Sequence, residues 1–290
     1  MTKNSIDVAF IILHYKNIDD TLECIESIKK INTKNYKIIA IDNNSGSEKD
    51  LKKLKKVVDD LIINNKNIGF AKGNNKGIDL AKEKYNPKYI AVINNDTIIQ
   101  QPDLIERVDD IYKETKFDAL GFNILTNNGD SVNPFPSYKT LEQVNKAIKK
   151  SKKLIKIYKS PLKRTLLKIY LKIKYTFIKI KHPNNAQERL EDVSLHGCEI
   201  IFSNKYLKKY KYAFYNETFL YHEEEFLEYR RSKDNLKFVY DPNIIIFHKE
   251  GSSLNFNYSN DLYKKMIFRE TNIIKSLTML KNIMEENKEI

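Results

Sequence analysis

Two polar clusters in the sequence stand directly after runs of apolar residues. Asp42 follows the run 36–41, and Asn94-Asn95-Asp96 follows the run 89–93. Such runs are typical of buried parallel strands, whose carboxyl ends meet at the sheet edge where ligands bind. An aspartate there can accept a hydrogen bond from a ribose hydroxyl or a base, and Asp96 suits Mg²⁺ or Mn²⁺ held through a substrate diphosphate. The alternative for both clusters is a turn.

Residues 67–77 read Asn-Ile-Gly-Phe-Ala-Lys-Gly-Asn-Asn-Lys-Gly. Three glycines before an expected helix allow a ligand to approach the backbone closely and leave N–H groups for a phosphate. The segment is not a Walker loop, because no Gly-Lys-Ser/Thr follows. It is not the dinucleotide fingerprint either, because it follows the third expected strand rather than the first. A structural turn explains the glycines equally well.

The third candidate is the acidic run Glu223-Glu224-Glu225. Adjacent carboxylates repel one another, so we expect at least one raised pKa, which suits a general base. The alternative is a solvated first turn of a helix, where acids favour the helix dipole. His248, after a later strand-like run, is a candidate neutral imidazole ligand for the same divalent ion.

Strand and helix patterns alternate through the first hundred residues, which predicts right-handed crossovers and a parallel sheet. The expected strands in this part are 8–13, 36–41, 61–63 and 89–93. Further strands are expected at 119–125, 199–202, 237–240 and 244–247, the last two separated by Asp241-Pro242. An amphipathic helix is expected from about residue 260.

The net charge of +13 is concentrated in one segment, residues 139–182, which holds fifteen of the 51 Lys and Arg residues and one acid. Apolar residues recur there every three or four positions, as in a helix that lies on an anionic membrane. A solvated helical insertion is the alternative. Specific nucleic-acid binding would need arginines and aromatic stacking, whereas this segment has one Arg and fourteen Lys.

Cysteine usage and hydropathy exclude other classes. Two cysteines exclude a disulfide framework and a Cys-based zinc site. No apolar run reaches the ~18 residues that a membrane-spanning helix needs. We therefore expect a cytoplasmic protein.

Taken in chain order, these motifs resemble the family 2 glycosyltransferases, and more narrowly the rhamnosyl- and galactofuranosyltransferase-like branch that builds bacterial capsule and O-antigen. The resemblance covers about Val8 to Ser253, apart from the basic segment. It implies an α/β fold of the GT-A type. In that fold a Rossmann-like, mostly parallel central sheet is flanked by helices, here with a basic helical insertion and a C-terminal helix.

The resemblance also implies roles for individual residues. The family's Asp-x-Asp motif maps to Asn94-x-Asp96, with Asn94 in place of the first acid, and Asp96 and His248 are the implied metal ligands for Mg²⁺ or Mn²⁺. Glu224 is the implied base, with Glu223 beside it. The implied donor-binding residues are His14, Tyr15, Asp42, Asn67, Gly69, Phe70, Ala71, Gly73, Asn74, Asn94 and Asn95.

The implied enzyme moves a sugar, with inversion, from a UDP- or dTDP-linked donor to a lipid-linked saccharide acceptor at the inner face of the cell membrane. The expected parts are a nucleotide-sugar-binding half (1–125), a basic membrane-associating insertion (139–182), an acceptor and catalytic half (190–255) and a C-terminal helical segment (256–290). The rivals are a basic nucleic-acid-binding protein and a nucleotidyltransferase. The latter needs a glycine-rich loop after the first strand, and residues 14–17 contain no glycine.

Overall fold

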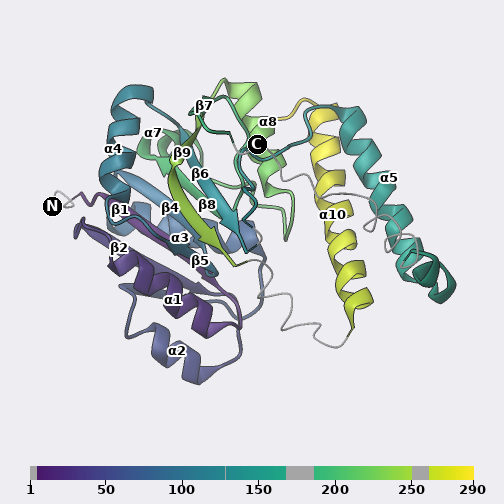
Figure 1. Ribbon diagram of the computed structural model, residues 1–290, viewed down its shortest axis with the longest axis horizontal. Coiled ribbons are helices and arrows are strands. Elements are labelled where there is room, and N and C mark those ends of the chain that lie inside the picture. The colour runs from purple at the N-terminus through teal and green to yellow at the C-terminus, as the bar shows by residue number, and fades with distance from the viewer. Residues whose placement is uncertain (1–4, 128, 168–185, 250–260) are drawn as a thin grey trace.

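Four parallel strands from the first hundred residues form one half of a central sheet (Figure 1). The computed structural model describes residues 5–127, 129–167, 186–249 and 261–290. The strands are β1 (Val8–His14), β2 (Tyr36–Asp42), β3 (Asp60–Ile63) and β4 (Tyr89–Asn94). β1 lies between β2 and β4, with His14 opposite Asp42 and Leu13 opposite Asn94. This register brings the polar strand ends to one edge, as the sequence predicts.

Helices connect these strands because both faces of the sheet are apolar and must be covered. They are α1 (Ile18–Lys29), α2 (Glu48–Leu54), α3 (Phe70–Lys84) and α4 (Leu104–Thr115). Local sequence sets two of their starts, since the side chains of Asn17 and Ser47 accept hydrogen bonds from the first turns of α1 and α2. Isoleucines of α1 and α4 pack on one face of the sheet, and Ala71 and Ile78 of α3 pack on the other.

The second half of the sheet is mixed. It contains β5 (Thr97–Ile99), β6 (Ala119–Thr126), β7 (Leu190–Glu191), β8 (Glu199–Ser203) and β9 (Phe238–His248). β8 is antiparallel to both β4 and β6, while β9 is parallel to β6 and antiparallel to β5 and β7. Among the described residues nine strands thus join one sheet, in the order β3-β2-β1-β4-β8-β6-β9-β5 with β7 beside β9.

The two strands expected at 237–240 and 244–247 are one strand, β9. Its register against β6 shifts between Phe122, opposite Asp241, and Asn123, opposite Ile245. Pro242 has no N–H to donate to the hydrogen bonds between strands, so the residues around it form a bulge and the strand continues beyond it. Asp241 stabilises the bulge by accepting hydrogen bonds from the Asn243 amide (2.9 Å) and from the Arg189 side chain (2.8 Å).

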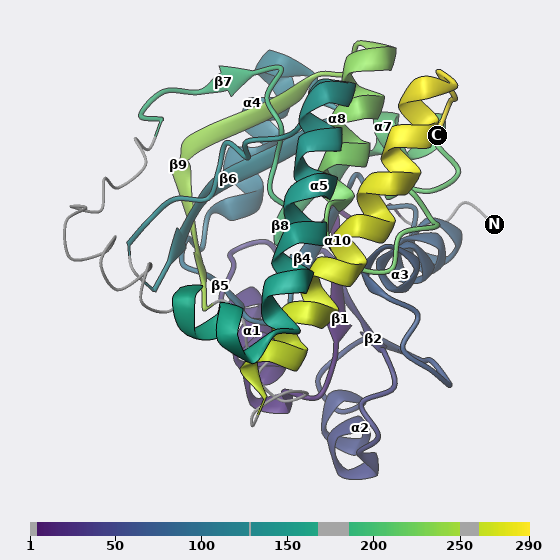
Figure 2. The ribbon, with the colours of Figure 1, turned by 90° about the vertical axis from the view of Figure 1, so that its right-hand side faces the viewer.

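Two long helices form a layer beside the sheet, α5 (Leu141–Tyr158) and α10 (Leu262–Glu285) (Figure 2). They pack on each other and on α8 (Glu223–Asp234), which follows the short α7 (Asn204–Lys209), through an apolar cluster of its own. After α5 the chain is helical again over 161–167. The rest of the expected amphipathic segment, 168–182, lies outside the described residues. Among the described helices, none combines the length and apolarity that crossing a membrane requires.

One carboxyl group lies inside the core of the sheet. Glu199 begins β8 opposite Ile93, is fully buried, and has no hydrogen-bond partner for either carboxylate oxygen within the described residues. Burial raises its pKa to about 8, so the group is neutral at neutral pH. Burial also raises the pKa of the neighbouring Cys24 thiol, and the charge of Glu199 adds to this effect at the higher pH where Glu199 is ionised.

This acid predicts a pH-dependent stability. Because its pKa is higher in the folded state than in the unfolded chain, the folded state binds the proton more tightly, and stability falls as the pH rises from about 4.5 through 8. We expect Glu199→Gln to flatten that decline when melting temperature is recorded between pH 5 and pH 9. The exposed Glu83→Gln should leave the slope unchanged. An unaltered slope in Glu199→Gln would contradict the assignment.

Candidate functional site

His14 and Asp42 lie side by side at the ends of β1 and β2, and both are buried. The His14 Nδ1 atom is 2.8 Å from the Thr21 hydroxyl, and its Nε2 atom is 4.0 Å from the Asp42 carboxylate. Burial lowers the pKa of His14 against the opposing effect of Asp42, which favours a neutral ring. Asp42 accepts hydrogen bonds from the Ser45 amide and hydroxyl. Its carboxylate therefore forms the turn that the sequence left as the alternative.

The glycine-rich loop is held to the end of β2 by Asn43, a residue that the sequence analysis did not single out. The Asn43 side chain donates to Asn67 Oδ1 (2.9 Å) and accepts from the Ile68 amide (3.0 Å). Asn67 in turn accepts from the Gly69 amide (2.9 Å). The run of asparagines after β2 was the available signal, since asparagine side chains often bond nearby backbone.

The three glycines of this loop and helix lie against other parts of the chain. Gly69 has φ +87°, and a Cβ there would lie 2.2 Å from the Phe219 carbonyl oxygen. A Cβ on Gly73 would meet Leu13, and one on Gly77 would meet Ile41 and Ile11. Close packing explains all three glycines without a ligand. A donor-binding role for the loop stays a prediction.

The same loop supports the segment that carries the acids. The Phe70 amide donates to the Phe219 carbonyl (2.7 Å). Asn75, on α3, donates to the Phe214 carbonyl (2.9 Å) and accepts from the Phe214 amide (3.1 Å). Ala71 and Asn74 are buried in α3, and the Asn74 side chain donates to the Phe70 carbonyl (3.1 Å). α3 therefore holds residues 214–219 through backbone contacts.

Asp96 and His248, 152 residues apart, meet because β5 pairs with the end of β9. The His248 Nε2 atom is 3.1 Å from the Asp96 carboxylate, and both side chains are buried. The Asn95 side chain donates to Thr21 (3.0 Å). No group of three His, Cys, Asp or Glu side chains gathers closely enough for a metal ion in the part of the chain that is described. One carboxylate and one imidazole fit an ion that also takes diphosphate oxygens and waters.

The three acids at the start of α8 have different surroundings. Tyr221 (φ +72°) and His222 (φ +67°) are consecutive left-handed residues, a strained turn of the kind found at functional sites. Glu223 is buried, and burial together with the Glu224 charge raises its pKa to about 8. Glu225 lies 3.0 Å from His222 Nδ1, and burial raises its pKa. The expectation of a raised pKa is confirmed for both.

Glu224 is partly exposed and accepts a hydrogen bond from the Gly197 amide (3.0 Å). It lines a cleft of about 350 Å³ together with Asn94, Phe70 and Glu223. The cleft thus joins predicted residues from β4, α3 and α8. His14 and Asp42 do not line it. Its other walls were not foreseen and consist of Phe135, His196, Gly197, Cys198, Leu220, Tyr221, His222, Arg269 and Ile273.

His196 links this cleft to the Asp96–His248 pair. Its ring centroid is 6.2 Å from that of His248 and 5.6 Å from that of Phe135. The His196 Nδ1 atom accepts from the Cys198 amide (3.2 Å), which leaves the proton of a neutral ring on Nε2. The strand-like run that begins beside it was the only signal in the sequence.

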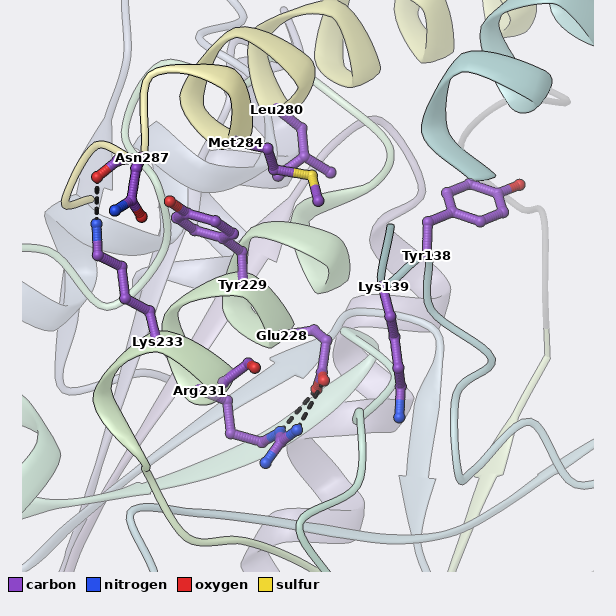
Figure 3. A pocket seen from close by; sticks show the side chains of 10 residues that line it. Tyr138, Lys139, Glu228, Tyr229, Arg231, Lys233, Leu280, Met284 and Asn287 are labelled. Carbon is purple, nitrogen blue, oxygen red and sulfur yellow. Dashed lines mark hydrogen bonds and ion pairs between the residues drawn. The ribbon is translucent and has the colours of Figure 1, made fainter. Parts of the chain in front are cut away.

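A second cavity, of about 320 Å³, contains none of the predicted residues (Figure 3). It lies at the junction of α8 and α10. Arg231 holds the Glu228 carboxylate through two hydrogen bonds of 2.8 Å, and Lys233 donates to the Asn287 carbonyl (Figure 3). Because Arg231 and Glu228 neutralise each other and Lys233 is bound to a carbonyl, the cavity is best explained as a contact region between α8 and α10.

Comparison with known proteins bears on the family and the fold. Residues 9–177, more than half of the chain, match the model of the family described as glycosyl transferase family 2. A search among curated proteins finds no match.

Three solved structures share the fold. Staphylococcus aureus TarS 1–349 has a TM-score of 0.52 at 12% identity, over 96% of this chain and 72% of that one. Its complex with UDP has a TM-score of 0.52 at 12% identity, over 91% and 65%. GalNAc-T7 with UDP, GalNAc and Mn²⁺ has a TM-score of 0.56 at 11% identity, over 86% of this chain and 44% of that one.

This chain therefore spans less than two thirds of two of these structures, and identities this low show the fold alone. That fold is the expected GT-A fold, a mixed α/β sheet flanked by helices. The family match establishes that this chain belongs to glycosyl transferase family 2, and the fold agrees with that membership.

Proposed function

We propose that this enzyme transfers a sugar from a UDP- or dTDP-linked donor, with inversion, to a lipid-linked saccharide acceptor in the synthesis of a bacterial capsule or O-antigen. Its proposed sugar specificity is that of the rhamnosyl- and galactofuranosyltransferase-like branch of the family. The observation that carries the proposal is the partly exposed Glu224 in one cleft with Asn94, next to the buried Asp96–His248 pair. The TarS complex with UDP and the GalNAc-T7 complex with UDP and Mn²⁺ support a nucleotide donor and a divalent ion.

Glu224 is the general base in this proposal. Glu223 has a pKa of about 8 and is protonated at neutral pH, so it can donate a hydrogen bond to the acceptor but is not suited to take its proton. Glu225 is turned to His222. Phe226, two residues after Glu224, is apolar, buried and stacked on Tyr215 at a centroid distance of 4.7 Å. Glu224, aimed by the Gly197 amide, is thus the acid suited to remove the acceptor proton.

The donor side is assigned to the strand ends. His14, Tyr15 and Asp42 hold the nucleoside, and the loop from Asn67 to Asn74 lies against nucleotide and sugar. Asn94 and Asn95 complete this side. Asp96 and His248 would hold Mg²⁺ or Mn²⁺, which when bound supplies charge stabilisation to the leaving diphosphate. Buried surroundings strengthen such stabilisation, because the local dielectric is low.

The surface that contacts the membrane is assigned to the end of the helix layer where α5 ends and α10 begins. Leu162, Leu166 and Leu262 have exposed fractions of 73%, 59% and 61%. They lie near one another, because Tyr263 contacts both Tyr158 (6.3 Å between ring centroids) and Arg164 (4.1 Å). We call these three leucines the leucine patch. Lysines are frequent in α5 and in residues 159–163, which lead into this patch along the chain, and each lysine near anionic lipid adds up to ~1 kcal/mol. This end supports a peripheral protein at the inner face of the membrane.

The base assignment predicts a sharp difference between adjacent residues. Glu224→Gln should lower turnover by roughly 10² to 10⁴-fold and leave donor affinity nearly unchanged. Glu223→Gln should lower turnover less than Glu224→Gln does and should raise the acceptor KM more. Initial rates at saturating donor, recorded against pH, test this prediction, because loss of the general base also removes the acidic limb of the pH–rate profile. If Glu223→Gln alone loses both turnover and that limb, the two roles are reversed.

The metal assignment predicts that Asp96→Ala abolishes Mn²⁺-dependent transfer, and that His248→Ala raises the Mn²⁺ requirement by at least about tenfold. Calorimetric Mn²⁺ binding in the presence of UDP gives a readout independent of turnover. The exposed, surface-paired Asp110 offers a control, Asp110→Ala, which should match the wild type. Full transfer by Asp96→Ala in excess chelator would refute a metal role for this residue.

The membrane assignment predicts that the protein sediments with anionic vesicles, and that salt releases it because exposed charges are screened. Replacing all three residues of the leucine patch with serine should weaken vesicle binding by at least about tenfold. Ile63→Ser is the matched control, since Ile63 is 55% exposed on the edge strand β3. Equal losses in both variants would show that the patch is not the membrane contact.

A further inference from the structure

Arg269 is the basic side chain among the residues that line the cleft, and the sequence analysis assigned it no role. It belongs to α10, is exposed, and shares the cleft with Glu224. No hydrogen bond or ion pair reaches its guanidinium from the described residues. Most other arginines are engaged, for example Arg189, Arg230 and Arg231. An unpaired guanidinium in a substrate cleft offers five donors to an anion.

The packing of α10 places Arg269 on the wall that carries the base. Ile273, one helical turn further on, also lines the cleft. Ile273 packs in the apolar cluster that contains Phe226 of α8 and Tyr221 just before it. Asn94 and Phe70 belong instead to the strand-end side. Under the proposed inversion, the acceptor attacks from the base's side, opposite the leaving diphosphate.

The position of Arg269 along α10 also relates it to the membrane contact. α10 begins at Leu262, within the leucine patch. Seven residues separate Leu262 from Arg269, which is about 10 Å at 1.5 Å per helical residue. A phosphate that joins a lipid to a saccharide lies just outside the acyl region. One helix therefore places an apolar residue and a cation at a spacing that suits the two parts of such a molecule.

We propose that Arg269 binds the phosphoryl group of the lipid-linked acceptor, an inference that rests on the proposed function. A planar guanidinium can hold two phosphoryl oxygens at once, which fixes orientation as well as position. Its charge also compensates for bringing an anionic acceptor close to the Glu224 carboxylate. The same chemistry could bind the donor diphosphate, so the test separates the two sources.

Two probes distinguish them. UDP with Mn²⁺ reports the donor site, and farnesyl phosphate, a short isoprenyl monophosphate, reports the acceptor site. We expect Arg269→Gln to weaken farnesyl phosphate binding roughly 10- to 100-fold and UDP binding less than twofold, as measured by calorimetry. Arg269→Lys should have an intermediate affinity for farnesyl phosphate, because lysine keeps the positive charge but cannot bind two phosphoryl oxygens at once as the planar guanidinium does. Lys275→Gln removes an exposed charge from the same helix outside the cleft and should match the wild type.

Farnesol, which lacks the phosphate, shows whether the effect belongs to the anion. It should bind wild type and Arg269→Gln equally weakly. Three results overturn the inference: farnesyl phosphate binds Arg269→Gln as tightly as wild type, UDP binding falls equally, or farnesol binding falls equally. The second result would assign Arg269 to the donor, and the third to packing alone. Absence of UDP binding in the wild type would instead count against the proposed function.

Discussion

The close approach of Gly69 to Phe219 is the constraint on which the cleft depends. The Phe70 amide donates to the Phe219 carbonyl, and no side chain at residue 69 could fit beneath that oxygen. This contact, with the paired bonds of Asn75 to Phe214, anchors the chain just before the acids. The strained turn at Tyr221 and His222 then starts α8 at a defined place. A loop that the sequence suggested for phosphate binding thus supports the acidic residues.

Burial then gives three chemically identical side chains different properties. Consecutive residues at a helix start point in directions about 100° apart, so the three carboxylates meet different surroundings even where two of the residues border the same cleft. Glu223 is directed into the protein and holds its proton to about pH 8, Glu225 lies against His222, and Glu224 reaches the cleft. No intrinsic property of glutamate distinguishes them.

This explains what the sequence could and could not predict. Strands β1, β2 and β4 are continuous apolar runs ending in polar residues, so their positions in the chain and the grouping of their ends follow from local pattern, whereas their order in the sheet does not. The meeting of Asp96 with His248 depends on β5 pairing with β9, which the family resemblance suggested and periodicity could not. Arg269 carried no signal, because an arginine on an amphipathic helix usually faces solvent. Only the packing of α10 on α8 brings it to the cleft.

The substitution of Asn94 for an acid has a consequence for the proposed mechanism. Two acids at this turn would hold a divalent ion without substrate, whereas Asp96 and His248 offer one negative charge between them. A diphosphate supplies the missing anionic oxygens, so metal and donor would bind cooperatively, each raising the affinity of the other by the same factor. In the proposed mechanism the donor would therefore complete the metal site, and the positive charge of the ion would be largely cancelled by the diphosphate that binds with it.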